Sequence, residues 1–178
     1  LKMKDKTGEH LSLEAACTPE DLTAIHRLRF QAYCQEFPML DPGQYPGAEE
    51  RDQFDPYSIQ LLARSRKEVV GTLRLIKDSP LGFLMEQSFR LPPLDRSKAL
   101  EHSRGVVRKD YRGRDIHTLL TEAAYVWHRH HGFTICLGAA TEIVKSSLCR
   151  KGWKMIGEPL EYHNTIATPI MLCLNEEK

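Results

Sequence analysis

One segment near the middle of the chain, EHSRGVVRKDYRGRDIHTLL (101–120), restricts the fold more than any other part. Its first half alternates in polarity up to Arg108, as is typical of a β-strand. From Ile116 onward, apolar residues recur at helical spacing (Ile116, Leu119, Leu120, Ala123 and Trp127). The sequence therefore predicts a strand that passes through a basic turn into a helix. Such a helix N-terminus can hold an anion or a polar cofactor, because its first backbone N–H groups are unpaired.

Length and charge indicate one domain without a strongly charged partner. A chain of 178 residues can bury about 70% of the surface that its unfolded form would expose, so residues 1–178 need no second domain. Residues 1–8 are expected to be a disordered end. The 25 lysines and arginines nearly balance 24 acidic residues, so the net charge of +1 gives no indication of nucleic acid or an anionic membrane surface.

The cysteines and the hydropathy indicate the compartment. The five cysteines are an odd number, form no CxxC pair and follow no secretory segment, which is typical of reduced core thiols in a cytoplasmic protein. They are Cys17, Cys34, Cys136, Cys149 and Cys173. No apolar run approaches the ~18 residues of a membrane-spanning helix, so no transmembrane segment is expected.

The pattern of elements predicts an α/β fold of three layers with a mixed central sheet. Before the central strand we expect a strand over 10–17, a helix from Pro19 behind the N-cap Thr18, a long loop over 37–48, a hairpin of 59–65 and 69–76, and an irregular segment over 78–94. After the central helix we expect a strand over 133–139 and a helix from Thr141 to Gly152. Two last strands are expected over 154–157 and 168–174, with a turn region at 161–164. The antiparallel pairs at the start exclude a doubly wound sheet. The chain has no GxGxxG fingerprint, P-loop or GxSxG elbow, so dinucleotide, nucleoside triphosphate and serine hydrolase functions lose support.

Charged residues occur where the patterns call for apolar ones. Arg29 lies beside the apolar stripe of the first helix, either as a snorkelling side chain or with a buried partner. Arg74 shares a strand face with apolar neighbours, so it needs a carboxylate or a polar pocket, because an unpaired buried arginine is costly. Glu50, Asp52 and Asp55 end the long loop as a carboxylate cluster, which is either a solvated acidic turn or part of a site.

Four segments together resemble one group of acyltransferases. They are HRLRFQAYCQE around Arg29, ERDQFD at the end of the long loop, VVGTLRLI around Arg74, and EHSR at the start of the central strand. Their order and spacing resemble the acyl-homoserine lactone synthases, and more closely the N-acyl amino acid synthases and the exosortase-associated acyltransferases, in which LRxxxYCxE, YPxGxExDxxD and GTLRL recur. The resemblance spans Leu28 to Trp153 and implies a GNAT-like (acyl-CoA N-acyltransferase) fold.

The resemblance implies an N-acyltransferase that moves a fatty acyl group from an acyl carrier protein thioester to the amine of an amino acid or a related small molecule. The implied catalytic set is Glu101, Ser103, Arg104 and Gly105. The implied substrate-binding set is Arg29, Tyr33, Asp52, Asp55 and Arg74, and the implied donor-binding set is Val106, Val107, Arg108, Arg112, Gly113 and Arg114. No cofactor beyond the acyl thioester is expected.

Two alternatives stay open at this point. The first is an acyl-homoserine lactone synthase that uses S-adenosylmethionine, which the sequence disfavours because Phe37 stands where that family has the tryptophan of its LGW segment. The second is a noncatalytic module that binds an acyl thioester or an amino acid. The complete ionic set favours an enzyme, since a binding module would not need all of it.

The chemistry of amide formation suggests roles for some of these residues. An amine acceptor arrives as an ammonium ion and must lose a proton before it attacks a thioester, so we expect Glu101 to act as the base. Its alternative role is a structural ion pair with Arg29 or Arg74. Gly105 could permit a β-bulge whose freed N–H groups hold the oxyanion. The carboxylate of an amino acid would be bound in bidentate fashion by Arg104 or Arg29.

The turn after the central strand bears on the acyl donor. GNAT proteins have an RxxGxG/A loop there, but this chain has Asp115 and His117 where the pattern has small residues. A negative charge and a bulky ring should weaken a hold on the pyrophosphate of CoA. A basic patch of Arg108, Lys109, Arg112 and Arg114 would suit an acidic carrier helix. We therefore expect an acyl carrier protein over CoA, the alternatives being a solvated turn or a tolerant CoA site.

Histidine and cysteine chemistry receives little support from the sequence. His128, His130 and His131 have no carboxylate or cysteine beside them at helical spacing, so no metal site is expected. Cys34 and Cys149 have no recognisable base partner. Direct acyl transfer is therefore expected, without a covalent enzyme intermediate.

Overall fold

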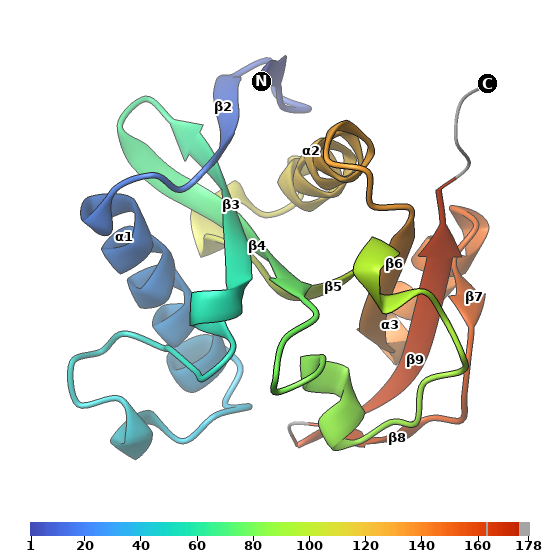
Figure 1. Ribbon diagram of the computed structural model, residues 1–178. Coiled ribbons are helices and arrows are strands. Elements are labelled where there is room, and N and C mark those ends of the chain that lie inside the picture. The colour runs from blue at the N-terminus through green and yellow to red at the C-terminus, as the bar shows by residue number, and fades with distance from the viewer. Residues whose placement is uncertain (163, 175–178) are drawn as a thin grey trace.

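The computed structural model describes residues 1–162 and 164–174, which build one mixed sheet between layers of helices (Figure 1). The strands are β1 (Lys2–Lys4), β2 (His10–Ala15), β3 (Ser58–Ser65), β4 (Glu68–Lys77), β5 (Ala99–Val107), β6 (Ile135–Thr141), β7 (Lys154–Met155), β8 (Leu160–Tyr162) and β9 (Thr165–Cys173). Their order is β1-β2-β3-β4-β5-β6-β9-β7, and β8 also pairs with β9. Among these strands only β5 and β6 run parallel.

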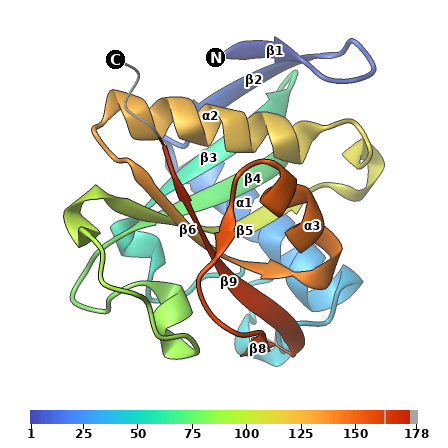
Figure 2. The same cartoon turned by 90° about the vertical axis from the view of Figure 1, so that its right-hand side faces the viewer.

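The helices lie on both faces of the sheet, as the three-layer prediction requires. They are α1 (Pro19–Phe30), which continues as a π-helical segment over Gln31–Glu36, α2 (Ile116–His130) and α3 (Glu142–Arg150), with 3₁₀ turns at Pro42–Gln44, Asp55–Tyr57, Leu84–Gln87, Arg96–Lys98 and Lys109–Tyr111. Figures 1 and 2 show α1 on one face and α2 and α3 on the other. The predicted start of α1 is confirmed, because Thr18 accepts a hydrogen bond from the Asp21 N–H at 3.1 Å and caps the helix.

The main core lies between α2 and strands β2 to β5. Ile116, Leu120 and Ala124 form the buried face of α2 and pack on leucines of β2 to β5. Gly71 lets α2 come close to β4, because a Cβ atom there would lie 3.0 Å from Ile116 Cγ2 and 3.1 Å from Leu120 Cδ1. The N-terminus of α2 is therefore held tightly against the sheet.

The structure corrects two sequence predictions at the ends of the chain. Residues 1–8 are not disordered throughout, because β1 pairs with β2 in the register Lys2↔Ser12 and the Leu13 N–H donates to the Leu1 carbonyl at 2.7 Å. The predicted turn region at 161–164 begins within β8, and the last strand starts earlier than predicted, at Thr165. His163 of that turn, and residues 175–178 of the predicted domain, lie outside the described residues.

Two irregularities of β5 open the sheet near its centre. β5 and β6 pair only up to His102↔Gly138, although both strands continue, so they separate beyond that point. On the other side of β5, Thr72 pairs with Val106 and Arg74 with Ser103. Two residues of β5, Arg104 and Gly105, thus face the single residue Leu73, which is a β-bulge. The bulge predicted at Gly105 is confirmed, and it lies beside the gap between the strands.

The cysteines are only partly core residues. All five are free thiols, and Cys34 and Cys136 are buried as predicted. Cys17 and Cys173 are exposed, which corrects the prediction of core thiols for these two. Within the described residues, no helix is long and apolar enough to cross a membrane.

We expect the substitution Gly71→Val to lower the free energy of unfolding by about 1–3 kcal/mol, because the added methyl groups would overpack the contact with Ile116 and Leu120. Gly47→Ala is the matched control, since a Cβ atom at Gly47 meets nothing within 4 Å. Urea denaturation of both variants measures the effect. Equal midpoints for Gly71→Val and the wild type would contradict the tight packing of α2 on β4.

Candidate active site

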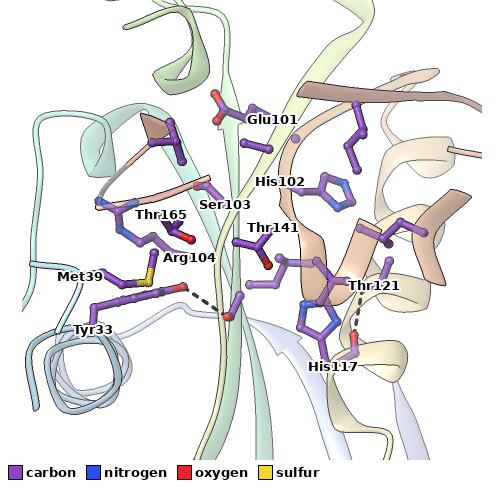
Figure 3. A pocket seen from close by; sticks show the side chains of 18 of the residues that line it. Tyr33, Met39, Glu101, His102, Ser103, Arg104, His117, Thr121, Thr141 and Thr165 are labelled. Carbon is purple, nitrogen blue, oxygen red and sulfur yellow. Dashed lines mark hydrogen bonds between the residues drawn. The ribbon is translucent and has the colours of Figure 1, made fainter. Parts of the chain in front are cut away.

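A cavity of about 330 Å³ lies where β5 and β6 separate, and side chains from both faces of the sheet line it (Figure 3). We call the two parts the α1-side chamber, lined by Tyr33, Met39, Glu101, Ser103, Arg104 and Thr165, and the α2-side chamber, lined by His102, His117, Thr121, Gly138, Leu148 and Trp153. The gap between the strands joins them. The volume falls at the lower end of the ~300–1,000 Å³ of small-molecule sites.

Glu101 is the buried acid of the α1-side chamber. Its side chain lines the cavity, is only 1% exposed, and accepts a hydrogen bond from the Met85 N–H at 3.1 Å. Burial raises the pKa of Glu101 to about 7, although the Met85 N–H and the charge of Arg74 act in the opposite direction. No arginine or lysine of the described residues lies within ion-pair distance of it. The alternative role as an ion-pair partner is therefore wrong, and the carboxyl group has a pKa suited to accepting a proton near neutral pH.

Beside this chamber lies an arginine–carboxylate cluster, made of Arg29, Glu50, Asp52, Asp55, Arg74 and Arg104. Arg29 comes from α1 and is fully buried. It donates through Nε to Glu50, and through Nη1 and Nη2 to Asp55 at 2.7 and 3.3 Å. The end of the long loop, with the two carboxylates that follow it, is thereby attached to the helix, and the snorkelling alternative for Arg29 is wrong.

The other two arginines attach the same loop to the sheet. Arg74 on β4 donates to both oxygens of Asp52 at 2.6 and 2.9 Å, to Asp55 at 2.9 Å and to the Ser103 hydroxyl at 2.9 Å. Arg104 on β5 donates to Glu50 at 3.1 Å and to Asp52 at 3.0 Å. Three positive charges thus meet three negative charges, so the cluster is balanced, with Arg29, Arg74 and Glu50 fully buried and the other three members partly buried.

The cluster changes the acidity of its carboxyl groups. Burial by itself would raise the pKa of Asp55, but the charges of Arg29 and Arg74 and the hydrogen bonds from Arg29 overcome this and hold the pKa well below its usual range. The pKa of Asp52 is lowered in the same way by Arg74 and Arg104. A carboxyl whose folded-state pKa is depressed stabilises the fold above its unfolded pKa of about 3.9 and loses that contribution as the pH falls.

The bulge of β5 is clamped from both faces. Arg104 has a φ of 50°, a left-handed conformation that costs a non-glycine residue about 1–3 kcal/mol and needs support from its surroundings. Its ion pairs provide that support, and Tyr33 donates from its hydroxyl to the Gly105 carbonyl at 3.3 Å. On the other face His117 approaches so closely that a Cβ atom at Gly105 would lie 2.8 Å from its Nε2. A side chain at position 105 would therefore have to displace the His117 ring at the point where the strand faces the cavity.

The turn between β5 and α2 is not the free basic patch that the sequence predicts. Arg108 pairs with Asp110 and Glu68, Arg112 pairs with Glu36, and Arg114 pairs with Glu9. The surface is therefore one of mixed charge, which corrects that part of the argument for an acidic carrier. The predicted donor-binding residues lie outside the cavity lining, and their role stays a prediction.

The three histidines considered for a metal site, His128, His130 and His131, separate into one buried and two exposed residues. His130 and His131 are exposed, so the three do not form a common group. The buried His128 lies with its Nε2 atom 2.9 Å from Nε2 of His102, and Cys136 Sγ is 3.7 Å from His128 Nδ1. Among the described residues, His102, His128 and Cys136 form the group whose side chains lie close enough together to hold a metal ion. Desolvation lowers the pKa of His128 to about 4 and raises the pKa of the Cys136 thiol, so both groups are neutral near pH 7. A hydrogen bond between the neutral rings of His102 and His128 accounts for their close approach.

The structure sorts the predicted site residues into two groups. Tyr33, Glu101, Ser103, Arg104 and Gly105 line the cavity together. Arg29 and Arg74 are fully buried outside it, and Asp52 and Asp55 lie with them in the arginine–carboxylate cluster. The two buried arginines do not line the cavity, and their place favours a positioning role, so the substrate-binding role of these four residues stays a prediction.

Sequence reasoning missed several lining residues. His102 and Trp153 belong to segments that the sequence patterns identify, but no neighbouring residue in the sequence indicates that both side chains line the same cavity. His117 carries the one available signal, because it stands where the GNAT loop has a small residue. Its ring fills the space above Gly105.

We expect Arg29→Met to lower the free energy of unfolding by about 3–5 kcal/mol, because it removes one of the three positive charges and leaves the cluster with an excess negative charge. Glu50 would keep only Arg104, and Asp55 would keep only Arg74. Arg27→Met is the matched control on the same helix, since Arg27 is exposed and only pairs with Glu49 at 3.5 Å. Chemical denaturation at neutral pH measures both variants. A loss of the same small size in the two variants would contradict the structural role of the cluster.

Comparisons with known proteins agree with this architecture. Residues 28–122 match the family model described as an acetyltransferase (GNAT) domain. No protein of curated function matches the sequence. The solved structure of BjaI, a CoA-dependent acyl-homoserine lactone synthase with SAM and isopentyl-CoA, is similar with a TM-score of 0.76 and 22% identity over 88% of this chain and 78% of that one.

Two further structures show the same fold. The acyl-homoserine lactone synthase LasI has a TM-score of 0.77 and 17% identity, with 94% of this chain and 92% of that chain covered. FeeM, an N-acyl amino acid synthase from uncultured soil microbes, has a TM-score of 0.70 and 12% identity, with 92% and 90% covered. Because the family model spans more than half of the chain, the protein belongs to the GNAT acetyltransferase domain family.

Proposed function

We propose that the protein is an N-acyltransferase that moves an acyl group from a thioester to the amine of an amino acid or a related small molecule. The observation that carries the proposal is Glu101, a buried carboxyl group with a pKa of about 7 in a cavity where the central strand bulges and parts from its neighbour. Membership of the GNAT family supports acyl transfer in general. The nature of the acceptor and donor is our inference from the site.

The reaction that fits this site has three steps. Glu101 takes a proton from the ammonium group of the acceptor, directly or through a water molecule, and the free amine attacks the thioester carbon. Backbone N–H groups at the bulge around Gly105 stabilise the oxyanion of the tetrahedral intermediate. The C–S bond then breaks, the amide is released, and the leaving thiolate takes up a proton. No enzyme nucleophile is needed.

An amino acid suits the charges of the α1-side chamber. Arg104 lines the cavity with its side chain 9% exposed, whereas Arg29 is fully buried, so Arg104 is the arginine that can reach the acceptor's carboxylate. Glu101 lies in the same chamber to receive the ammonium group. The two ends of a zwitterion would therefore meet groups of opposite charge. Release of methylthioadenosine from S-adenosylmethionine during turnover would instead identify a lactone synthase.

For the donor we propose a thioester on an acyl carrier protein. The support is Asp115, which begins α2 with a φ of 62° and brings a carboxylate to the helix N-terminus, where CoA would need to place a pyrophosphate. The ring of His117, in the first turn of the same helix, occupies further space near Gly105. The arginines of this turn are already paired, so they contribute less to the argument than the sequence alone suggests.

We expect Glu101→Gln to lower kcat/KM by about 100-fold or more, because the amide cannot accept the ammonium proton. In the wild type, kcat/KM should rise with pH through about 7 as Glu101 ionises, and this limb should be absent in the variant. Glu86→Gln, in the loop next to Met85 and paired with Arg96, is the matched control. Acyl transfer measured from pH 5 to 9 tests this, and an unchanged profile in Glu101→Gln would reject Glu101 as the base.

Stability gives a second measure of the same carboxyl group. Since the folded protein keeps a proton on Glu101 that the unfolded chain releases above about pH 4.3, the free energy of unfolding should fall between pH 4.3 and about 7. Glu101→Gln should remove this part of the pH dependence. A noncatalytic binding module would show this stability effect but no turnover with any donor.

For the donor, we expect one acyl chain to have a higher kcat/KM on holo carrier protein than on CoA, because Asp115 repels the pyrophosphate. Asp115→Asn should improve the CoA reaction by several-fold and leave the carrier reaction nearly unchanged. Steady-state rates with both donors decide the matter. An equal or higher kcat/KM with CoA in the wild type would overturn the proposed carrier.

A further inference from the structure

The α2-side chamber differs in chemistry from the α1-side chamber. No acidic, lysine or arginine side chain of the described residues lines it, and Leu73, Val144, Leu148 and Ile170 supply much of its wall. The α1-side chamber holds Glu101 and Arg104. If the proposed acyl transfer is correct, the acceptor belongs with these charges and the acyl chain belongs in the α2-side chamber, where it can leave water.

The α2-side chamber has a built end. Trp153 is 4% exposed and donates from its indole N–H to the Tyr125 hydroxyl at 2.8 Å. The His102 ring stands 5.7 Å from the Trp153 ring in a T-shaped arrangement and is fixed by its 2.9 Å contact with His128. Tyr125 and His128 do not line the cavity, so they stand behind the wall and brace it. We call Trp153 and His102 the end wall.

The end wall restricts the length of an acyl chain. The whole cavity measures about 330 Å³, at the lower end of the roughly 300–1,000 Å³ of sites that hold small molecules. The acceptor and the thioester need part of that space. We propose that this protein selects short and medium acyl groups, of roughly ten carbons or fewer, and that Trp153 and His102 set the limit. The inference rests on the proposed function, because the size of the chamber limits chain length only if an acyl chain binds there.

Gly138 offers a way to shorten the chamber without disturbing the fold. It lines the cavity on β6, and a Cβ atom there would lie 3.7 Å from Trp153 Cζ3 and 3.6 Å from the His102 carbonyl oxygen, both ordinary van der Waals distances. Gly138→Ala therefore adds one methyl group at the end wall. Trp153→Leu does the reverse and lengthens the chamber. Ile143→Ala on α3 is the control, because Ile143 is 92% exposed and points away from the cavity.

The test uses butanoyl, octanoyl, dodecanoyl and palmitoyl thioesters, each on CoA and on holo carrier protein. Binding is measured by calorimetry without any acceptor, and turnover by thiol release with a mixture of amino acids. We expect the butanoyl or octanoyl group to have the highest affinity and kcat/KM, and palmitoyl to be at least about tenfold worse. In Gly138→Ala, the longest accepted chain should lose about tenfold while butanoyl stays within about twofold.

The outcomes separate the two proposals. If palmitoyl binds and reacts as well as octanoyl, or if Gly138→Ala affects all chain lengths equally, the length limit is wrong although acyl transfer stands. If no acyl thioester binds at any length, the proposed function itself fails. Trp153→Leu should extend the accepted length toward dodecanoyl, and if that variant does not fold, Gly138→Ala and the wild-type series decide the question alone.

Discussion

The arginine–carboxylate cluster is the interaction on which the site depends. A single arginine among apolar residues would be costly, but three arginines and three carboxylates satisfy one another. Their elements are far apart in the sequence, so the cluster joins α1, the long loop, β4 and β5 into one wall. Each member pairs with two others, so removing one leaves its neighbours with a single partner each and the cluster with an unbalanced charge. The charges thus hold the shape of the site, and only Arg104 among the arginines also reaches the cavity.

The wall in turn stabilises an irregular central strand. A left-handed Arg104 would not persist in a regular strand, but its ion pairs with Glu50 and Asp52 and the contact of Tyr33 with Gly105 hold the bulge in place. Beyond His102 the neighbouring strand departs, so this irregular backbone faces a cavity and not another strand. The bulge of β5 and its separation from β6 thus supply the space and the unpaired backbone groups that acyl transfer requires.

The extent of the sequence prediction follows from how local each signal is. The capping residues of α1, the hairpin and the strand–turn–helix centre depend on neighbours in the sequence, and these elements are confirmed. The buried charges at Arg29 and Arg74 indicated partners, because an unpaired charge inside a protein is so costly. Their choice of Glu50, Asp52 and Asp55 needed the structure.

Other features could not be predicted because their partners are remote. The arginines after β5 look like a basic patch in the sequence, but their carboxylates, such as Glu9 and Glu36, come from distant segments. β1 is only three residues long, too short for its alternation to identify a strand, so its pairing with β2 defines it. The end wall is similar, since His102 and Trp153 and the residues that brace them, Tyr125 and His128, come from β5, α2 and the segment after α3.

One measurement tests the central claim, that this cavity forms an amide from a thioester and an amine. Purified protein would be incubated with an octanoyl thioester and an equal mixture of the common amino acids, and the products resolved by mass spectrometry. The account predicts an N-octanoyl amino acid together with one equivalent of free thiol, and initial rates of both products lower by about 100-fold or more in the Glu101→Gln variant. Free octanoic acid as the only product, or thiol release without any amide, would contradict it.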